Sequence, residues 1–175
     1  MKCAHTVSFG SAIAAVVVAT GAAAQDPRGV AAAVDRWLMQ SCGVGDAQAQ
    51  VQELTALGPA AVPALVQAYE QGPATGAVGQ ADRAAARRFA LYRRRLEQAD
   101  GLGLSAADLA RARAVTLAQF TARARLDFTA QYRGEALRGL GVLGGARAVG
   151  VLRSVSALGE APYAAIARLA LERIK

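Results

Sequence analysis

The side chains with the most evident chemical potential in this sequence are arginines, which are concentrated in one part of the chain. Ten of them lie between residues 83 and 125 against three carboxylates, and this excess equals the net charge of +7 of the whole chain. Guanidinium groups bind phosphates and carboxylates through paired hydrogen bonds. One interpretation is a solvated helix face whose long side chains cover the edge of a core. The other is a surface that binds an anion or a partner through Arg83, Arg87, Arg88, Arg94, Arg95, Arg111 and Arg113.

Few other residues could support catalysis or hold a metal. The sole histidine is His5, and the two cysteines are Cys3 and Cys42. A zinc site needs several such ligands, and a Ser-His-Asp triad needs an imidazole. The carboxylates are scattered along the chain. The glycines of segment 139–144 resemble a dinucleotide-binding loop in spacing, but such a loop follows a β-strand, and the segment that precedes these glycines has the pattern of a helix. We therefore predict a protein that is not an enzyme, with no catalytic residue, no metal site and no cofactor.

The N-terminus has the three parts of a secretory signal peptide. Lys2 precedes an apolar run from Val7 to Ala19, and small residues follow up to Ala24. The run is shorter than the roughly 20 apolar residues that cross a bilayer. We expect cleavage after Ala24, which leaves residues 25–175 as a single domain in the periplasm or outside the cell; a retained N-terminal anchor is the alternative. The mature chain would then have no histidine and one cysteine, Cys42, either a buried small residue or a thiol that pairs between chains.

Composition and spacing predict helices throughout the mature chain. Alanine, which is the least costly residue to place in a helix, occurs 44 times. Apolar residues at helical spacing, bounded by proline and glycine, predict helices over 27–42, 46–57, 59–71 and 81–98. Residues 72–79 are expected to be a loop.

The arginine-rich middle is expected to be a pair of helices. In the first, over 81–98, Ala85, Phe89, Tyr92 and Leu96 share one face. After a turn at 100–104, Ser105 and Asp108 predict a capping box, with one long helix following as far as Phe128. We interpret this pair, over 80–130, as an enlarged repeat.

Two segments outside the middle pair share a pattern. Leu54-x-x-Leu57-Gly58 recurs as Leu140-x-x-Leu143-Gly144, and the apolar positions of 132–143 recur 31 residues later in 163–174. A period of this length is typical of stacked helical pairs. Residues 46–72 and 131–174 resemble the short HEAT-like repeats named after phycobilisome lyases. The resemblance implies an α-solenoid that presents a binding surface and has no catalytic residues of its own; an ordinary helical bundle is the alternative.

These observations predict an all-α fold, a short α-solenoid of stacked HEAT-like hairpins with an elongated basic helical pair in the middle. The expected function is that of an exported, non-catalytic protein-interaction or scaffold module. The alternative is a binder of an anionic lipid head group or a phosphorylated glycan through the arginine-rich helices. Nucleic acid is a poor partner for an exported protein. Only Phe89 and Tyr92 interleave the arginines, and because both are expected to be buried they offer no stacking platform for bases. No transmembrane segment is expected in the mature chain.

Overall fold

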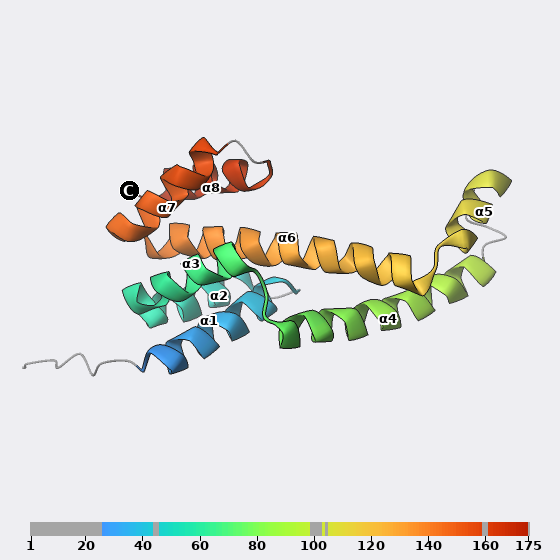
Figure 1. Ribbon diagram of the computed structural model, residues 1–175, viewed down its shortest axis with the longest axis horizontal. Helices are drawn as coiled ribbons and strands as arrows, with labels where there is room; N and C mark the ends of the chain where they lie inside the picture. Colours follow the sequence, from blue (N-terminus) through green and yellow to red (C-terminus); the bar gives the residue numbers. More distant parts are fainter. Residues whose placement is uncertain (1–25, 44–45, 99–102, 104, 159–160, 175) are drawn as a thin grey trace, which may run out of the picture.

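A computed structural model describes residues 26–43, 46–98, 103, 105–158 and 161–174 of the chain. Within these ranges every regular element is a helix, as the sequence predicts (Figure 1). The predicted signal peptide, and the predicted turn at 100–104 apart from Gly103, lie outside the described residues. In chain order the elements are α1 (Pro27–Ser41), α2 (Ala47–Leu57), the 3-10 helix η1 (Gly58–Ala61), α3 (Val62–Gln71), α4 (Thr75–Glu97), α5 (Ala106–Ala114), α6 (Leu117–Leu143), α7 (Gly145–Ala157) and α8 (Tyr163–Arg173).

The ends of the N-terminal helices follow from local side-chain chemistry. The Asp26 and Asp46 carboxylates accept hydrogen bonds from free backbone N–H groups at the starts of α1 and α2. Gly58 ends α2 with a φ of 62°, and Gly72 ends α3 with a φ of 76°, a region in which a side chain would be strained. The expected helical corner at Gly58-Pro59 is present, although the chain there first makes the turn η1 before α3 begins.

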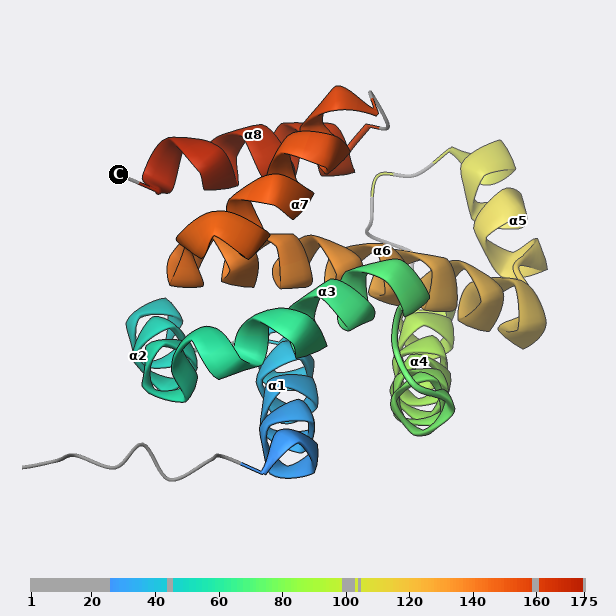
Figure 2. The ribbon, with the colours of Figure 1, turned by 60° about the vertical axis from the view of Figure 1, so that its left-hand side comes forward.

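Helix α6 is the axis of the molecule. Its 27 residues correspond to about 40 Å of helix. The C-terminal half lies against α3 on one side and against α7 and α8 on the other, as Figures 1 and 2 show. Between these helices lies a continuous apolar core, whose largest fully buried side chains are Leu38, Leu54, Leu65, Leu137, Leu140, Leu152 and Val34.

The N-terminal half of α6 leaves the core together with α4 and α5 (Figure 1). We call these three segments, residues 75–97 and 106–127, the basic arm. Phe120 of α6 packs against Phe89 and Tyr92 of α4, with ring centroids 5.4 and 5.8 Å apart. The predicted stripe on α4 is confirmed in that its two ends, Ala85 and Leu96, are buried. The arm is therefore held by its own small apolar interior, outside the main core cluster.

Two expected boundaries within the arm are wrong. Helix α4 begins at Thr75, six residues before the expected start, so that most of the segment expected to be a loop is helical. Ala77 is buried in this first turn, and its packing outweighs the low helix propensity of the neighbouring glycines. The single helix expected after Ser105 is instead two, because the chain is extended at Val115 and Thr116. Thr116 and Gln119 then form a complete capping box that starts α6.

The expected division between a middle pair over 80–130 and a C-terminal repeat over 131–174 is also wrong. Helix α6 runs without interruption from Leu117 to Leu143, so one helix serves both the basic arm and the core. Helical periodicity reveals no such sharing, because it shows which residues face inward and not which neighbour they face. Among the described residues, no helix is both long enough and apolar enough to cross a membrane.

Candidate functional site

The predicted site residues on α4 form an exposed, unpaired cationic surface. Helix α4 positions Arg83, Arg87, Arg88, Arg94 and Arg95, and all five side chains are exposed. None of these five forms a hydrogen bond or an ion pair with another of the described residues. Like charges three or four residues apart on one helix repel each other. The folded chain therefore has cationic groups whose charge no carboxylate within the described ranges offsets directly.

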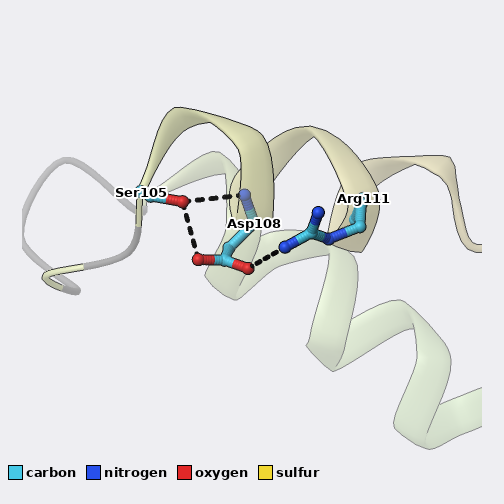
Figure 3. A network of polar contacts seen from close by, with 3 residues as sticks. All are labelled: Ser105, Asp108 and Arg111. Atoms are coloured by element: carbon cyan, nitrogen blue, oxygen red, sulfur yellow. Dashed lines mark hydrogen bonds and ion pairs between the residues drawn. The ribbon is translucent and has the colours of Figure 1, made fainter.

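The two predicted site residues on α5 have structural partners instead. Arg111 forms an ion pair with Asp108 at 2.5 Å, and the Ser105 hydroxyl donates to the same carboxylate at 2.6 Å, as Figure 3 shows. The hydrogen bond from Ser105 has the larger effect and that from Arg111 the smaller, and both lower the pKa of Asp108. Arg113 donates to the Leu96 carbonyl oxygen at 3.3 Å. Arg111 and Arg113 thus help to build the tip of the basic arm, a role that the sequence alone did not distinguish from ligand binding.

The Ser105–Asp108 capping box is confirmed in one half. The Ser105 hydroxyl accepts a hydrogen bond from the Asp108 backbone N–H at 3.1 Å, as predicted. The Asp108 carboxylate, which was expected to reach back to a backbone N–H, is instead bonded to the Ser105 hydroxyl and to Arg111.

Two carboxylates just outside residues 83–125 pair with arginines of the basic arm and so reduce its unpaired positive charge. Asp82 of α4 forms an ion pair with Arg125 of α6 at 2.6 Å, and the bond raises the pKa of Arg125. Asp127 forms an ion pair with Arg123 at 3.1 Å. The unpaired positive charge is consequently concentrated on α4 and does not extend evenly over the whole basic pair.

A groove of about 440 Å³ lies where the basic arm joins the core. The C-terminal end of α1 forms one side, and α4 and α6 form the others. Its apolar lining consists of Met39, Cys42, Ala81, Ala84, Ala124 and Phe128. Its polar lining consists of Gln80, Arg87, Arg88, Asp127 and Gln131, with Gly43 at the end of α1. Sequence reasoning missed this groove, because its walls come from three helices that are far apart in the chain.

The groove face of α4 continues toward the tip of the arm. Residues three, four and seven positions apart on a helix share a face, which aligns Ala84, Arg88 and Leu91, with Arg95 one turn beyond. The Leu91 side chain is 55% exposed and lies on this face between Arg88 and Arg95. Apolar and basic side chains therefore alternate along one exposed strip of α4.

Cys42 lies at the core end of the groove and is half-buried. Burial, with a smaller contribution from the nearby Glu135 carboxylate, raises the pKa of its thiol to about 12, against the opposing effect of Arg138. The thiol is thus protonated at neutral pH. Cys42 packs against the apolar core and is partly buried, which is closer to the predicted buried small residue than to the alternative of a thiol that pairs between chains.

Within the described residues, no group of three or more His, Cys, Asp and Glu side chains lies close enough to hold a metal ion. No protein-family model, no curated protein sequence and no solved structure matches this chain. The similarity to HEAT-like repeats therefore remains a prediction from the residues of 46–72 and 131–174. The surface of α4 and the groove beside it have to be interpreted from their own chemistry.

Proposed function

We propose that this chain is an exported, non-catalytic helical-repeat module that binds an acidic partner protein through the basic arm. The observation that supports the proposal best is the set of five exposed arginines on α4 without a partner among the described residues. Fixed cationic groups on a rigid helix attract an oppositely charged surface and orient it during encounter. The export signal is the part of the proposal that rests on the sequence of residues 1–24 alone.

The order in which the helices pack favours a presenting role. The pair α2–α3 contacts α6, and α6 in turn contacts α7 and α8. Helical pairs that pack side by side in this way would also occur in a stack of HEAT-like pairs, although here they share one core around α6, and such stacks commonly expose a surface for another protein. In this interpretation the stack is the scaffold, and the basic arm is the part that reaches the partner.

An anionic lipid surface is the second candidate, and the packing of α4 disfavours it. A helix that lies in a membrane interface needs its apolar face free to enter the lipid. The apolar face of α4, with the buried Ala85 and Leu96, is directed toward the interior of the arm. Of its large apolar side chains only Leu91 is exposed, which gives little surface for a bilayer.

Photo-crosslinking in intact cells tests the proposal. A photoreactive residue in place of Leu91, on α4, is compared with one in place of Leu169, which is similarly exposed on α8. We expect a defined crosslinked protein from position 91 and not from 169, identified by mass spectrometry as having an acidic surface. The crosslink should disappear when Arg87, Arg88, Arg94 and Arg95 are all changed to Gln.

Equal crosslinks from both positions, or a crosslink that survives the four changes to Gln, would contradict the proposal. Vesicles of phosphatidylcholine with and without phosphatidylglycerol provide the comparison with lipid. Binding to the anionic vesicles that the four changes abolish, together with no protein crosslink at position 91, would assign the surface to the membrane instead. Either mode of charged recognition should weaken with salt, because exposed charges are screened over about 8 Å at physiological ionic strength.

A further inference from the structure

We propose that the groove beside α4 receives an apolar side chain of the partner, with partner carboxylates placed on each side of it. The occupant is then an acidic amphipathic segment, in which one apolar anchor residue lies between Asp or Glu residues. This inference rests on the proposed function and adds to it the chemistry of the segment that binds. In this proposal the arginines attract the acidic segment, and the groove gives specificity for a segment that has an apolar anchor residue.

The apolar floor of the groove is the first observation. Ala81 and Ala84 of α4 and Ala124 of α6 line it, and their short side chains leave the space open. Met39 of α1 and Phe128 of α6 add larger apolar side chains to the lining. A volume of about 440 Å³ is in the range of sites that hold a ligand group, and an apolar side chain buried there would lose contact with water.

The charge at the rim is the second observation. Arg87 and Arg88 line the groove, and neither has a hydrogen-bond or ion-pair partner among the described residues. Gln80 and Gln131 add amide groups that can donate to a carboxylate. The one acidic group of the lining, Asp127, already forms an ion pair with Arg123 at 3.1 Å, so its repulsion of an incoming carboxylate is reduced.

The strip beyond the groove is the third observation. Leu91 follows Ala84 by seven residues on the same helix face, and Arg94 and Arg95 come next. An acidic amphipathic segment lying along α4 would meet the groove, then Arg87 and Arg88, then Leu91, then Arg94 and Arg95. Complementarity therefore extends over several turns, as expected for an interface with a central anchor and a polar rim.

The test uses two synthetic probes and the full chain. One peptide has glutamates along one helix face with a single leucine in the middle, and the other has alanine in place of that leucine. Binding is measured by fluorescence anisotropy at low salt. We expect the leucine peptide to bind about tenfold more tightly than the alanine peptide, which is the effect of burying one such side chain.

Filling the groove should remove this difference. The Ala84→Leu variant places a larger side chain in the groove, and we expect it to bind both peptides with the affinity of the alanine peptide. Ala86→Leu is the matched control, since it makes the same change at an exposed position of the same helix outside the groove. It should retain the preference, and circular dichroism should show both variants folded.

The outcomes separate the two proposals. If both peptides bind equally to the unchanged chain, and the four changes of Arg87, Arg88, Arg94 and Arg95 to Gln abolish binding, the groove inference is wrong and the proposed function stands. If neither peptide binds at low salt, both are wrong. A preference that persists in Ala84→Leu would also overturn the inference, because the anchor would then bind elsewhere.

Cys42 gives an independent readout of groove occupancy. In a Cys3→Ala background it is the only thiol of the chain and lines the groove. The leucine peptide should slow its reaction with a maleimide at least severalfold, and the alanine peptide should slow it less. Equal labelling with and without the leucine peptide would contradict the inference even if the peptide binds to the arm.

Discussion

Individual polar side chains fasten the long helix α6 to its neighbours. The Tyr132 hydroxyl of α6 donates to the Asp35 carboxylate of α1 at 2.7 Å, while its ring is 3% exposed and lies 6.0 Å from that of Phe128. Burial and the contact with Asp35 raise the pKa of this tyrosine. At neutral pH the hydroxyl is therefore a permanent donor, which suits a bond between two helices of the core.

Removing this hydroxyl should weaken the whole core. Tyr132→Phe loses a hydrogen bond to a charged acceptor, and we expect the free energy of unfolding to fall by about 1.5–3 kcal/mol. Urea denaturation followed by the fluorescence of Trp37, which is buried in α1, measures the change. In the control Tyr92→Phe, the lost bond is to the Ala112 carbonyl within the arm, so the core transition should stay in place. An unchanged transition in Tyr132→Phe would show that the bond to Asp35 does not stabilise the core.

The thiol of Cys42 should react slowly with alkylating reagents unless the solution is strongly alkaline or the protein is unfolded. Its pKa in the folded chain is about 12, against 9.0 for a free thiol, so little thiolate is present near neutral pH. In a Cys3→Ala background at pH 8, we expect alkylation by iodoacetamide to be more than about tenfold slower in the native chain than in urea. The protonated thiol makes its full contribution to the free energy of unfolding below pH 9. This contribution is lost as the pH rises toward 12, because the thiolate forms at lower pH in the unfolded chain than in the folded chain. Equal alkylation rates would contradict the burial of the thiol.

At the scale of elements, the close approach of α6 and α8 depends on glycine. A Cβ added to Gly141 would lie 2.8 Å from the Ala170 Cβ and 3.1 Å from its Cα, which is closer than atoms in a packed core can lie. A Cβ added to Gly150, within α7, would meet nothing within 4 Å. The two positions are alike in sequence, since each is a glycine inside a helix, but only one is at a crossing.

Alanine at these two positions should have opposite effects on stability. We expect Gly141→Ala to lower the free energy of unfolding by about 1–3 kcal/mol, because α8 has to move away from α6. Gly150→Ala should raise it by about 0.5–1 kcal/mol, since alanine is the better helix former and space is available. Thermal unfolding by circular dichroism gives both values. Equal effects would mean that the two helices do not cross at Gly141.

Sequence periodicity predicts the helices of this chain well, and their partners poorly. The helix predicted over 27–42 is present as α1, and its buried residues, Val30, Val34, Trp37 and Leu38, have the helical spacing on which that prediction rests. The break before Leu117 escaped prediction although Thr116 and Gln119 have the spacing of a capping box, because the alanines and arginines around it favour helix on both sides. The groove could not be predicted, because it depends on how α1, α4 and α6 meet in space.

At the candidate site too, the sequence predicts which residues are present but not which partners they have in the fold. Their number and spacing predict a basic surface, and five of the seven singled out are exposed and unpaired. Arg111 pairs with Asp108 three residues earlier on the same helix. The partner of Arg113, the Leu96 carbonyl of α4, depends on how α4 and α5 pack together, which the sequence does not reveal. Charge density is a property of sequence, whereas the availability of each charge is a property of the fold.

At the scale of the whole molecule, the helices around α6 share one core. Leu140 is fully buried in the cluster that also contains Val34 of α1 and Leu152 of α7. A change at this position therefore affects the N-terminal and C-terminal helices together. This differs from the expectation for separate repeats, in which damage would stay in the C-terminal pair.

Leu140→Asp should unfold this core as a unit. An unpaired carboxylate in an apolar core costs about 4 kcal/mol or more, a large part of the stability of a domain of this size. We expect loss of the native Trp37 fluorescence in α1 and of helical circular dichroism at the same temperature. Leu169→Asp, at a side chain that is 58% exposed on α8, is the control and should change stability by less than about 0.5 kcal/mol. Loss of α7 and α8 alone would show that the core is divisible.

The path of the chain through the basic arm has a consequence for how such a protein can diversify. The polypeptide leaves the core at Gly72 and returns at Thr129, and a Cβ on Gly72 would lie 3.6 Å from the Thr129 methyl carbon. Nearby, Arg133 donates to the Glu70 carbonyl oxygen at 3.3 Å and fastens the two ends together. Topologically the arm is an insertion whose exit and entry coincide, and segments of that kind tolerate changes of length and composition. Related chains can therefore differ in the charge and length of the arm while the residues of the hydrophobic core stay the same.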